Sequence, residues 1–179
     1  MRLVVERAGS LMGGRVLAAI IPVGLGILGV LIANFPVSFL GGLVPPPLLV
    51  LMPIYYWAIV RPDLMSPFWI FVLGVLQDLL SGGPPGVWAA SFLATYSLID
   101  NQRDILASLS GVGAIVGFAV CAMLACGCAY VIVALYYWHL PPLAPTMAEV
   151  AVTVFLYVFA VFLLGGIHHR LVGPLRSDF

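Results

Sequence analysis

Residues Gly74–Ala89 read GVLQDLLSGGPPGVWA and place one carboxylate, Asp78, in an apolar stretch that ends in a run of Gly and Pro. The chain of 179 residues is 63% hydrophobic and 8% charged, and its mean hydropathy is +1.17. Seven Arg and seven acidic residues, with no Lys, are too few to cover the surface of a water-soluble domain. The composition therefore predicts an integral membrane protein.

The membrane-spanning elements are expected to be helices. Lipid offers no partner to an open backbone, so only helices and closed barrels cross a bilayer. The apolar runs of this chain are continuous and lack the alternation of barrel strands. We predict an all-α polytopic fold, one domain over residues 1–179, with spans at about 15–34, 44–60, 64–81, 86–99, 107–138 and 147–168. The first span follows a basic segment, but it is long for a signal peptide and lacks a clear cleavage site, so we interpret it as a membrane helix.

The arginines favour this even number of spans. All seven lie at the termini or in the loops at 61–63 and 100–104, whereas the loops at 35–43, 82–86 and 139–146 carry no charge. This is the positive-inside pattern, and it predicts that the N- and C-termini are both cytoplasmic. The span at 86–99 would cover only about 20 Å of a hydrocarbon core about 30 Å thick. Either this helix continues past Asp100, or the hairpin at 64–99 does not fully cross.

A stripe of small residues follows the fifth predicted span at intervals of four residues. Such a stripe lies along one ridge of a helix and lets helix backbones approach closely in lipid. It predicts a packing face, with packing inside the chain favoured over contact with a partner. Its members are Gly113, Gly117, Cys121, Ala125 and Ala129.

Other features have plain structural interpretations. Pro22 and Pro53 lie inside predicted spans, where each would free one backbone carbonyl and kink the helix. Cys121, Cys126 and Cys128 share one apolar segment that contains no His, whereas zinc takes four N or S ligands, so we expect no metal and no cofactor. The zero net charge and the lack of a basic stripe argue against nucleic acid as a partner.

The ionisable residues do not form a catalytic pattern. Asp78 is the clear carboxylate inside the predicted bilayer, and Glu149 lies near the outer end of the last span. The three His are near the predicted surfaces, and no GxSxG, HExxH or P-loop occurs. We therefore expect no enzymatic activity, and an intramembrane enzyme is the least favoured class.

Asp78 has a structural explanation instead. It lies near the C-terminal end of the third predicted helix, where a carboxylate opposes the helix dipole and needs donors from elsewhere. The residues GGPPG at 82–86 can end that helix, prevent its continuation and open the next one. We hypothesise that Asp78 accepts hydrogen bonds from the free N–H groups around Val87 and Trp88, or from the Trp88 indole, and so closes the hairpin.

The pattern GxxxDLLxGxPxG in this stretch resembles that of MreD, the family of bacterial rod shape-determining membrane proteins. It covers about a dozen residues, and the family usually has Pro-Leu-Gly where this chain has Pro84-Pro85-Gly86. The wider layout is also similar, with a Pro-rich second span, Val44–Pro53, followed by Tyr55-Tyr56-Trp57. The pattern is formed by Gly74, Asp78-Leu79-Leu80, Gly82, Pro84 and Gly86.

The resemblance implies a non-enzymatic scaffold of the cell-elongation machinery, which makes peptidoglycan, in the bacterial inner (cytoplasmic) membrane. The partners it implies are MreC, RodA with its penicillin-binding protein, the MreB filament indirectly, and membrane lipids. The implied fold resembles the six-helix substrate-binding subunits of energy-coupling-factor transporters. The alternative function is a small-molecule-binding subunit of a membrane transporter. Its cavity would be lined by Gln77, Asp78, Thr95, Tyr96 and Ser97.

Overall fold

The computed structural model describes residues 20–35 and 46–167, and these residues form only helices and their connections. The predicted all-α class is confirmed. Residues 15–19 of the first predicted span, 44–45 of the second and 168 of the last lie outside the described residues. So do five of the seven arginines, namely Arg2, Arg7, Arg15, Arg170 and Arg176. The described helices are Ile20–Ala33, α2 (Leu51–Val60), α3 (Pro67–Ser81), α4 (Val87–Asn101), α5 (Arg103–Ser108), α6 (Val112–Tyr137) and α7 (Leu143–Ile167).

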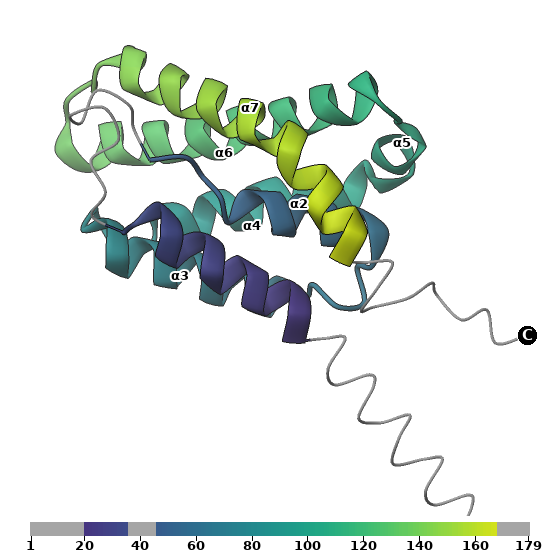
Figure 1. Cartoon of the computed structure of the whole chain (residues 1–179). Coiled ribbons are helices and arrows are strands. Elements are labelled where there is room, and N and C mark those ends of the chain that lie inside the picture. The colour runs from purple at the N-terminus through teal and green to yellow at the C-terminus, as the bar shows by residue number, and fades with distance from the viewer. Residues whose placement is uncertain (1–19, 36–45, 168–179) are drawn as a thin grey trace, which may run out of the picture.

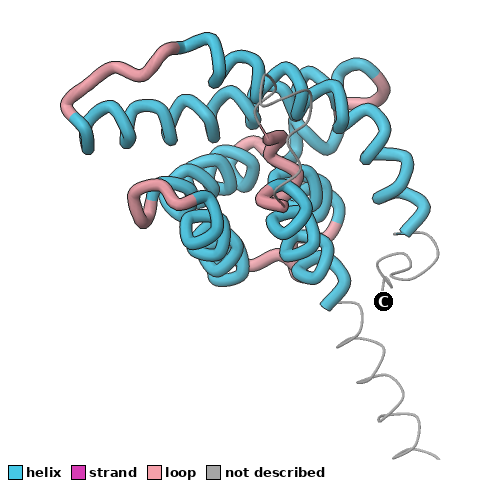
Figure 2. The backbone as a smooth tube through the Cα atoms, turned by 60° about the vertical axis from the view of Figure 1, so that its left-hand side comes forward, coloured by secondary structure: helices cyan, strands magenta, loops and turns pink. Residues whose placement is uncertain are grey.

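Two helical hairpins enclose the short helix α2. One hairpin is α3 with α4, the other is α6 with α7, and α4 packs against α6 between them. The turns of both hairpins lie at one end of the molecule, on the left in Figure 1, and α5 lies at the other end. In Figure 2 the α6–α7 hairpin lies above the other helices, which are viewed closer to their axes.

Helix α2 is the most buried element, with Leu51–Tyr55, Trp57 and Ala58 all buried. It contacts α4, α5, α6 and α7, as expected for a helix that is hydrophobic on every side. An aromatic cluster fixes it to the second hairpin. Tyr55 packs edge-on against Phe118 of α6 and Tyr157 of α7, whose own rings stack with centroids 3.8 Å apart.

The predicted helix at 44–60 is wrong in its first part, because the described chain becomes helical only at Leu51. Pro46 and Pro47 have no N–H to donate to a helix. The irregular backbone after them is stabilised from α7, where the Thr153 hydroxyl oxygen accepts a hydrogen bond of 3.0 Å from the Leu48 N–H. The ten residues of α2 extend only about 15 Å, half of a hydrocarbon core of about 30 Å.

The predicted kink at Pro53 is also wrong. Pro53 lies in the first turn of α2, where a missing N–H costs no helical hydrogen bond. The Leu49 carbonyl accepts a hydrogen bond of 3.2 Å from the Met52 N–H. Pro22 lies near the start of the described part of its helix, and the carbonyl at residue 18 is outside the described residues.

Further boundaries differ from the prediction, since α3 begins at Pro67 rather than at 64 and α7 begins at Leu143 rather than at 147. Helix α4 continues to Asn101, which is one of the two alternatives that its short span left open. The predicted helix at 107–138 is two helices, because α5 ends at Ser108 and α6 begins at Val112. Between them Leu109 is extended, and Gly111 has φ of 56°, a left-handed value that favours glycine.

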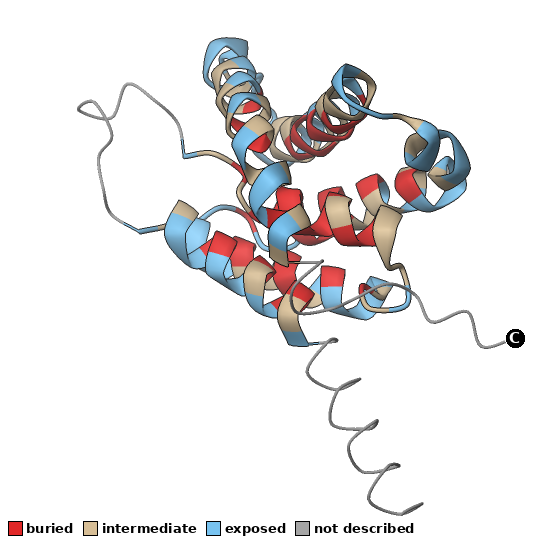
Figure 3. Cartoon of the chain, turned by 45° about the vertical axis from the view of Figure 1, so that its right-hand side comes forward, coloured by how far each residue is buried: buried red, intermediate tan, exposed pale blue. Residues whose placement is uncertain are grey.

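Helices α6 and α7 are long and apolar enough to cross a membrane, with 26 and 25 residues. Both helices carry large exposed hydrophobic side chains, and Figure 3 shows exposed segments in pale blue beside buried ones in red along the helices. On α7, Phe155, Phe159 and Phe162 are 64%, 62% and 77% exposed. Continuous apolar surface of this kind is typical of a face that meets lipid or another protein.

Helices α3 and α4 approach each other closely at Gly74, on α3. A Cβ built there would lie 2.4 Å from the Ala89 Cα of α4, so only glycine allows the two backbones to come this close. The contact lies one turn before Asp78, and it therefore sets the spacing at which Asp78 meets the start of α4.

We predict that Gly74→Ala lowers the free energy of unfolding by about 1–3 kcal/mol, because the added methyl group must push the two backbones apart. Gly127→Ala on α6 is the matched control, since a Cβ there has nothing within 4 Å. Reversible unfolding in mixed detergent measures both. Equal stability of the two variants would contradict the close approach.

Candidate functional site

Asp78 binds the first turn of α4 through its carboxylate. Its Oδ1 accepts a hydrogen bond of 2.8 Å from the Trp88 N–H. Its Oδ2 accepts two more, of 3.0 Å from the Gly86 N–H and 3.2 Å from the Ala89 N–H. The side chain is 6% exposed. The hypothesised contact is therefore present, with backbone amides as its donors.

This contact explains why a carboxylate is found in an apolar stretch. The first N–H groups of a helix have no partner within the helix, and they carry the positive end of its dipole. Gly86 provides no side-chain cap for α4, so Asp78 caps that helix from the end of the previous one. Hydrogen bonds to an ionised acceptor are stronger than neutral ones, and they offset the unfavourable position of Asp78 at the end of α3.

The turn between the two helices needs the residue types that it contains. Gly82 ends α3 with φ of 69°, and Gly86 precedes α4 with φ of 92°. Both are left-handed values that favour glycine. Pro84 between them is buried. Gly82, Pro84 and Gly86 thus shape the turn so that the N–H groups of α4 face Asp78.

A second polar contact braces the same end of α3. The Asn34 side-chain amide donates to the Gln77 side-chain oxygen at 3.1 Å and to the Val30 carbonyl at 2.9 Å. It joins the end of the helix Ile20–Ala33 to α3. The contact of Asn34 was not predicted from the sequence. The available signal was a pair of polar residues in apolar segments: Asn34 at the end of one long apolar run and Gln77 on another predicted span.

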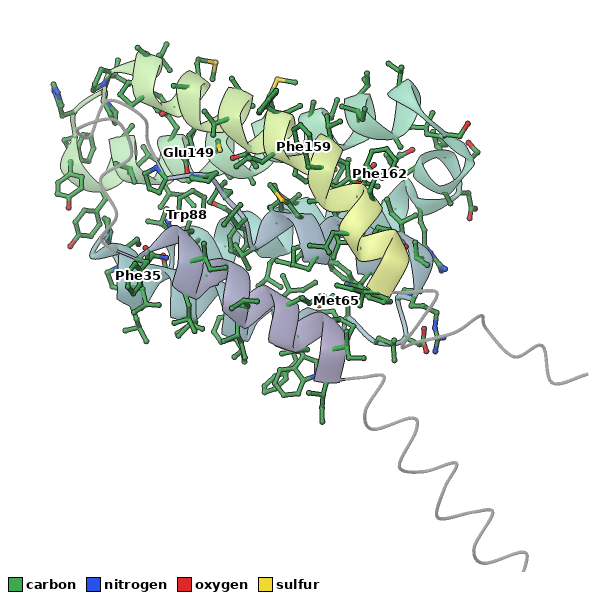
Figure 4. The ribbon with its side chains drawn as sticks, viewed as in Figure 1. Phe35, Met65, Trp88, Glu149, Phe159 and Phe162 are labelled. Carbon is green, nitrogen blue, oxygen red and sulfur yellow. The ribbon has the colours of Figure 1, made fainter. Side chains whose placement is uncertain are left out.

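A cavity of about 200 Å³ lies beside Asp78, between the two hairpins. Glu149 of α7 and Trp88 of α4 line it from opposite hairpins, as their labelled side chains in Figure 4 indicate. The Tyr130 hydroxyl, also in the lining, donates to the Pro141 carbonyl at 3.0 Å. The full lining is Asp78, Gly83, Pro84, Val87, Trp88, Cys126, Ala129, Tyr130, Val133, Pro141, Thr146 and Glu149.

This cavity is not the one that the transporter alternative predicted. Of the five residues expected to line it, only Asp78 does so. Gln77 is bound to Asn34, and Thr95 donates its hydroxyl to the Ser91 carbonyl within α4. Tyr96 and Ser97 are absent from the lining. Glu149 and the apolar wall of α6 take their place, because α6 packs against α4 and carries α7 with it.

The small stripe of α6 packs inside the chain. Gly117, Cys121, Ala125 and Ala129 are buried, and Gly113 is partly buried. A Cβ on Gly117 would lie 2.6 Å from the Tyr55 hydroxyl. The interpretation as an internal packing face thus agrees with the structure, and the four buried residues offer no surface to a partner. Within residues 20–35 and 46–167, no three His, Cys, Asp or Glu side chains gather as metal ligands.

No family model, no curated protein and no solved structure matches this chain. The similarity to MreD thus depends on the sequence pattern around Asp78.

Replacement of Asp78 should separate its acceptor role from its packing. Three donors share two oxygens, so Asp78→Asn keeps some acceptor capacity and Asp78→Ala keeps none. We expect Asp78→Ala to lower the free energy of unfolding by roughly 2–4 kcal/mol, because it leaves buried donors unpaired, and Asp78→Asn to lower it less. Asp100→Ala, at an exposed position, should change it little. An Asn variant as unstable as the Ala variant would show that the charge itself is essential.

Proposed function

We propose that this chain is an MreD-like scaffold of the bacterial inner membrane. In this proposal it has no enzymatic activity and binds other membrane proteins of the rod-shape and peptidoglycan-synthesis machinery. The expected partners are MreC and the synthase formed by RodA and its penicillin-binding protein, with the MreB filament reached indirectly.

One observation carries the proposal, namely that the MreD-like pattern has a separate structural role at nearly every position. Gly74 allows the close approach of α3 and α4, and Asp78 caps α4. Gly82 and Gly86 take left-handed conformations. The spacing of the pattern thus corresponds to one physical unit, a capped hairpin, which favours a shared structure over chance similarity.

The two leucines of the pattern have no such role. Leu79 is 73% exposed and Leu80 is 45% exposed. Both leucines are on the exposed surface of the hairpin, and they directly follow Asp78, which fixes the geometry of the hairpin. An exposed pair of large apolar residues on a rigid support suits contact with a helix of another membrane protein.

The proposed topology is multi-pass, with six apolar segments crossing or entering the bilayer and both termini in the cytoplasm. The two described arginines, Arg61 and Arg103, lie together at the α5 end, where Arg103 donates to the Ile59 carbonyl at 3.3 Å and Arg61 pairs with Asp63 at 2.9 Å. The turns at the other end carry no charge. By the positive-inside rule, the end that carries these arginines is the cytoplasmic one. There the arginines can contact anionic lipid.

Affinity purification of the chain from its native membrane in mild detergent, with mass spectrometry, tests the function. The proposal expects recovery of MreC and the wall synthase. We expect Leu79→Ala with Leu80→Ala to lower that recovery by about tenfold while the unfolding temperature stays the same. Phe155→Ala with Phe159→Ala, an equally exposed apolar pair on α7, is the control. Recovery of ATPase subunits and a bound small molecule in place of these proteins would favour the transporter alternative.

Cysteine labelling tests the topology. In a variant without the three native Cys, we expect His139→Cys to react with a membrane-impermeant maleimide in intact spheroplasts. We expect Asp104→Cys, at the arginine end, to react only after the membrane is opened. Both positions are exposed, so the order of reaction reports the side of the membrane. The reverse order would refute the proposed orientation.

A further inference from the structure

The cavity between the hairpins contains one half-buried carboxylate, Glu149, that has no partner among residues 20–35 and 46–167. Among the described residues, the Glu149 side chain has no hydrogen bond or ion pair, although its backbone carbonyl accepts one from the Thr153 hydroxyl. Asp78, on the other side of the cavity, is held by three N–H groups. The described arginines are both engaged at the opposite end of the molecule, Arg61 with Asp63 and Arg103 with the Ile59 carbonyl.

The surroundings of Glu149 make an unpaired carboxylate unfavourable. The wall facing it is formed mainly by apolar side chains, including Val87, Cys126, Ala129 and Val133. A carboxylate surrounded by such groups loses hydration, and pairing with a cation restores part of that free energy. Glu149 therefore creates a demand for positive charge that the described residues do not meet.

The size and lining of the cavity limit what can meet this demand. Its volume of about 200 Å³ is larger than a cavity of about 150 Å³ that accommodates benzene in an engineered protein. A ligand with a few carbon atoms and one polar head therefore fits. The indole of Trp88 and the ring of Tyr130 add aromatic surface, which favours cations. Two carboxylates in the lining exclude an anion.

We propose that this cavity binds an ammonium or guanidinium group carried on a short aliphatic stem. The cation pairs with Glu149 and lies near Asp78, and the stem packs along the apolar wall of α6. Two sources present this chemistry: a Lys or Arg side chain of a partner protein, and a free alkylamine. The lining includes Gly83 and Pro84 of one turn and Pro141 of the other, and these turns lie at the end of the molecule away from α5. This inference stands apart from the scaffold function, because the purified chain alone can display it.

The purified full chain in detergent allows a direct test. We expect n-butylammonium to raise its unfolding temperature saturably, and n-butanol and butyrate at equal concentration to fail to do so. Glu149→Gln should weaken this binding by at least about tenfold. Asp100→Asn, an exposed carboxylate at the other end, should bind as the wild type does.

The stability of the ligand-free variant is a second readout. If Glu149 serves a ligand, Glu149→Gln without ligand should unfold at the same temperature as the wild type or higher, because an unpaired charge is removed. A structural role would instead make this variant less stable. A destabilised Glu149→Gln variant, or equal n-butylammonium binding by wild type and variant, overturns the proposal.

A photo-crosslinking amino acid at Thr146, on the cavity lining, distinguishes the sources in cells. Crosslinks to a Lys- or Arg-containing segment of another membrane protein, lost in Glu149→Gln, identify a partner side chain. A free amine that copurifies with the wild type and not with Glu149→Gln identifies a small molecule. If neither depends on Glu149, the cavity does not bind cations in the cell and the proposal is overturned.

Discussion

The arrangement of this chain depends on one side chain, Asp78, which caps the helix that follows its own. Three backbone N–H groups at the start of α4 converge on its two oxygens. The bonds fix the angle and the register between α3 and α4, and the glycine at position 74 lets the helices meet at backbone distance. Because α4 also packs against α2 and α6, the position of that hairpin is transmitted to most of the molecule.

A second constraint is the short helix α2. A helix of ten residues in the centre of an apolar bundle has end groups that find no partner within the helix itself. The partners come from other elements: Thr153 of α7 binds the chain before α2, and Arg103 of α5 binds a carbonyl of its last turn. The polar groups of the irregular backbone before α2 are thus satisfied by side chains of the protein itself.

The sequence predicted those features whose causes are local. The all-α class follows from composition, and the capped hairpin follows from an acid that precedes two glycines and two prolines by a few residues. The small stripe on α6 is visible from its spacing of four residues. The start of α2 at Leu51 was missed, because three consecutive prolines outweigh the hydropathy of that segment.

The cavity could not be predicted, because its lining joins residues that are far apart in the sequence. Asp78 and Glu149 belong to different hairpins, and only the packing of α4 on α6 brings them to one cavity. Asn34 meets Gln77 for the same reason. Polar residues in the apolar segments could be identified from the sequence, but their pairing depends on helix order in space, which hydropathy and spacing do not determine.

Hydrogen exchange of the backbone amides of Gly86, Trp88 and Ala89, in the intact chain in a lipid nanodisc, tests the central claim most directly. We expect these three N–H groups to exchange slowly in the wild type. We expect Asp78→Ala to accelerate them selectively, with little change in the middle of α6. Rapid exchange of the three amides in the wild type would contradict a carboxylate that caps α4 and joins the two helices.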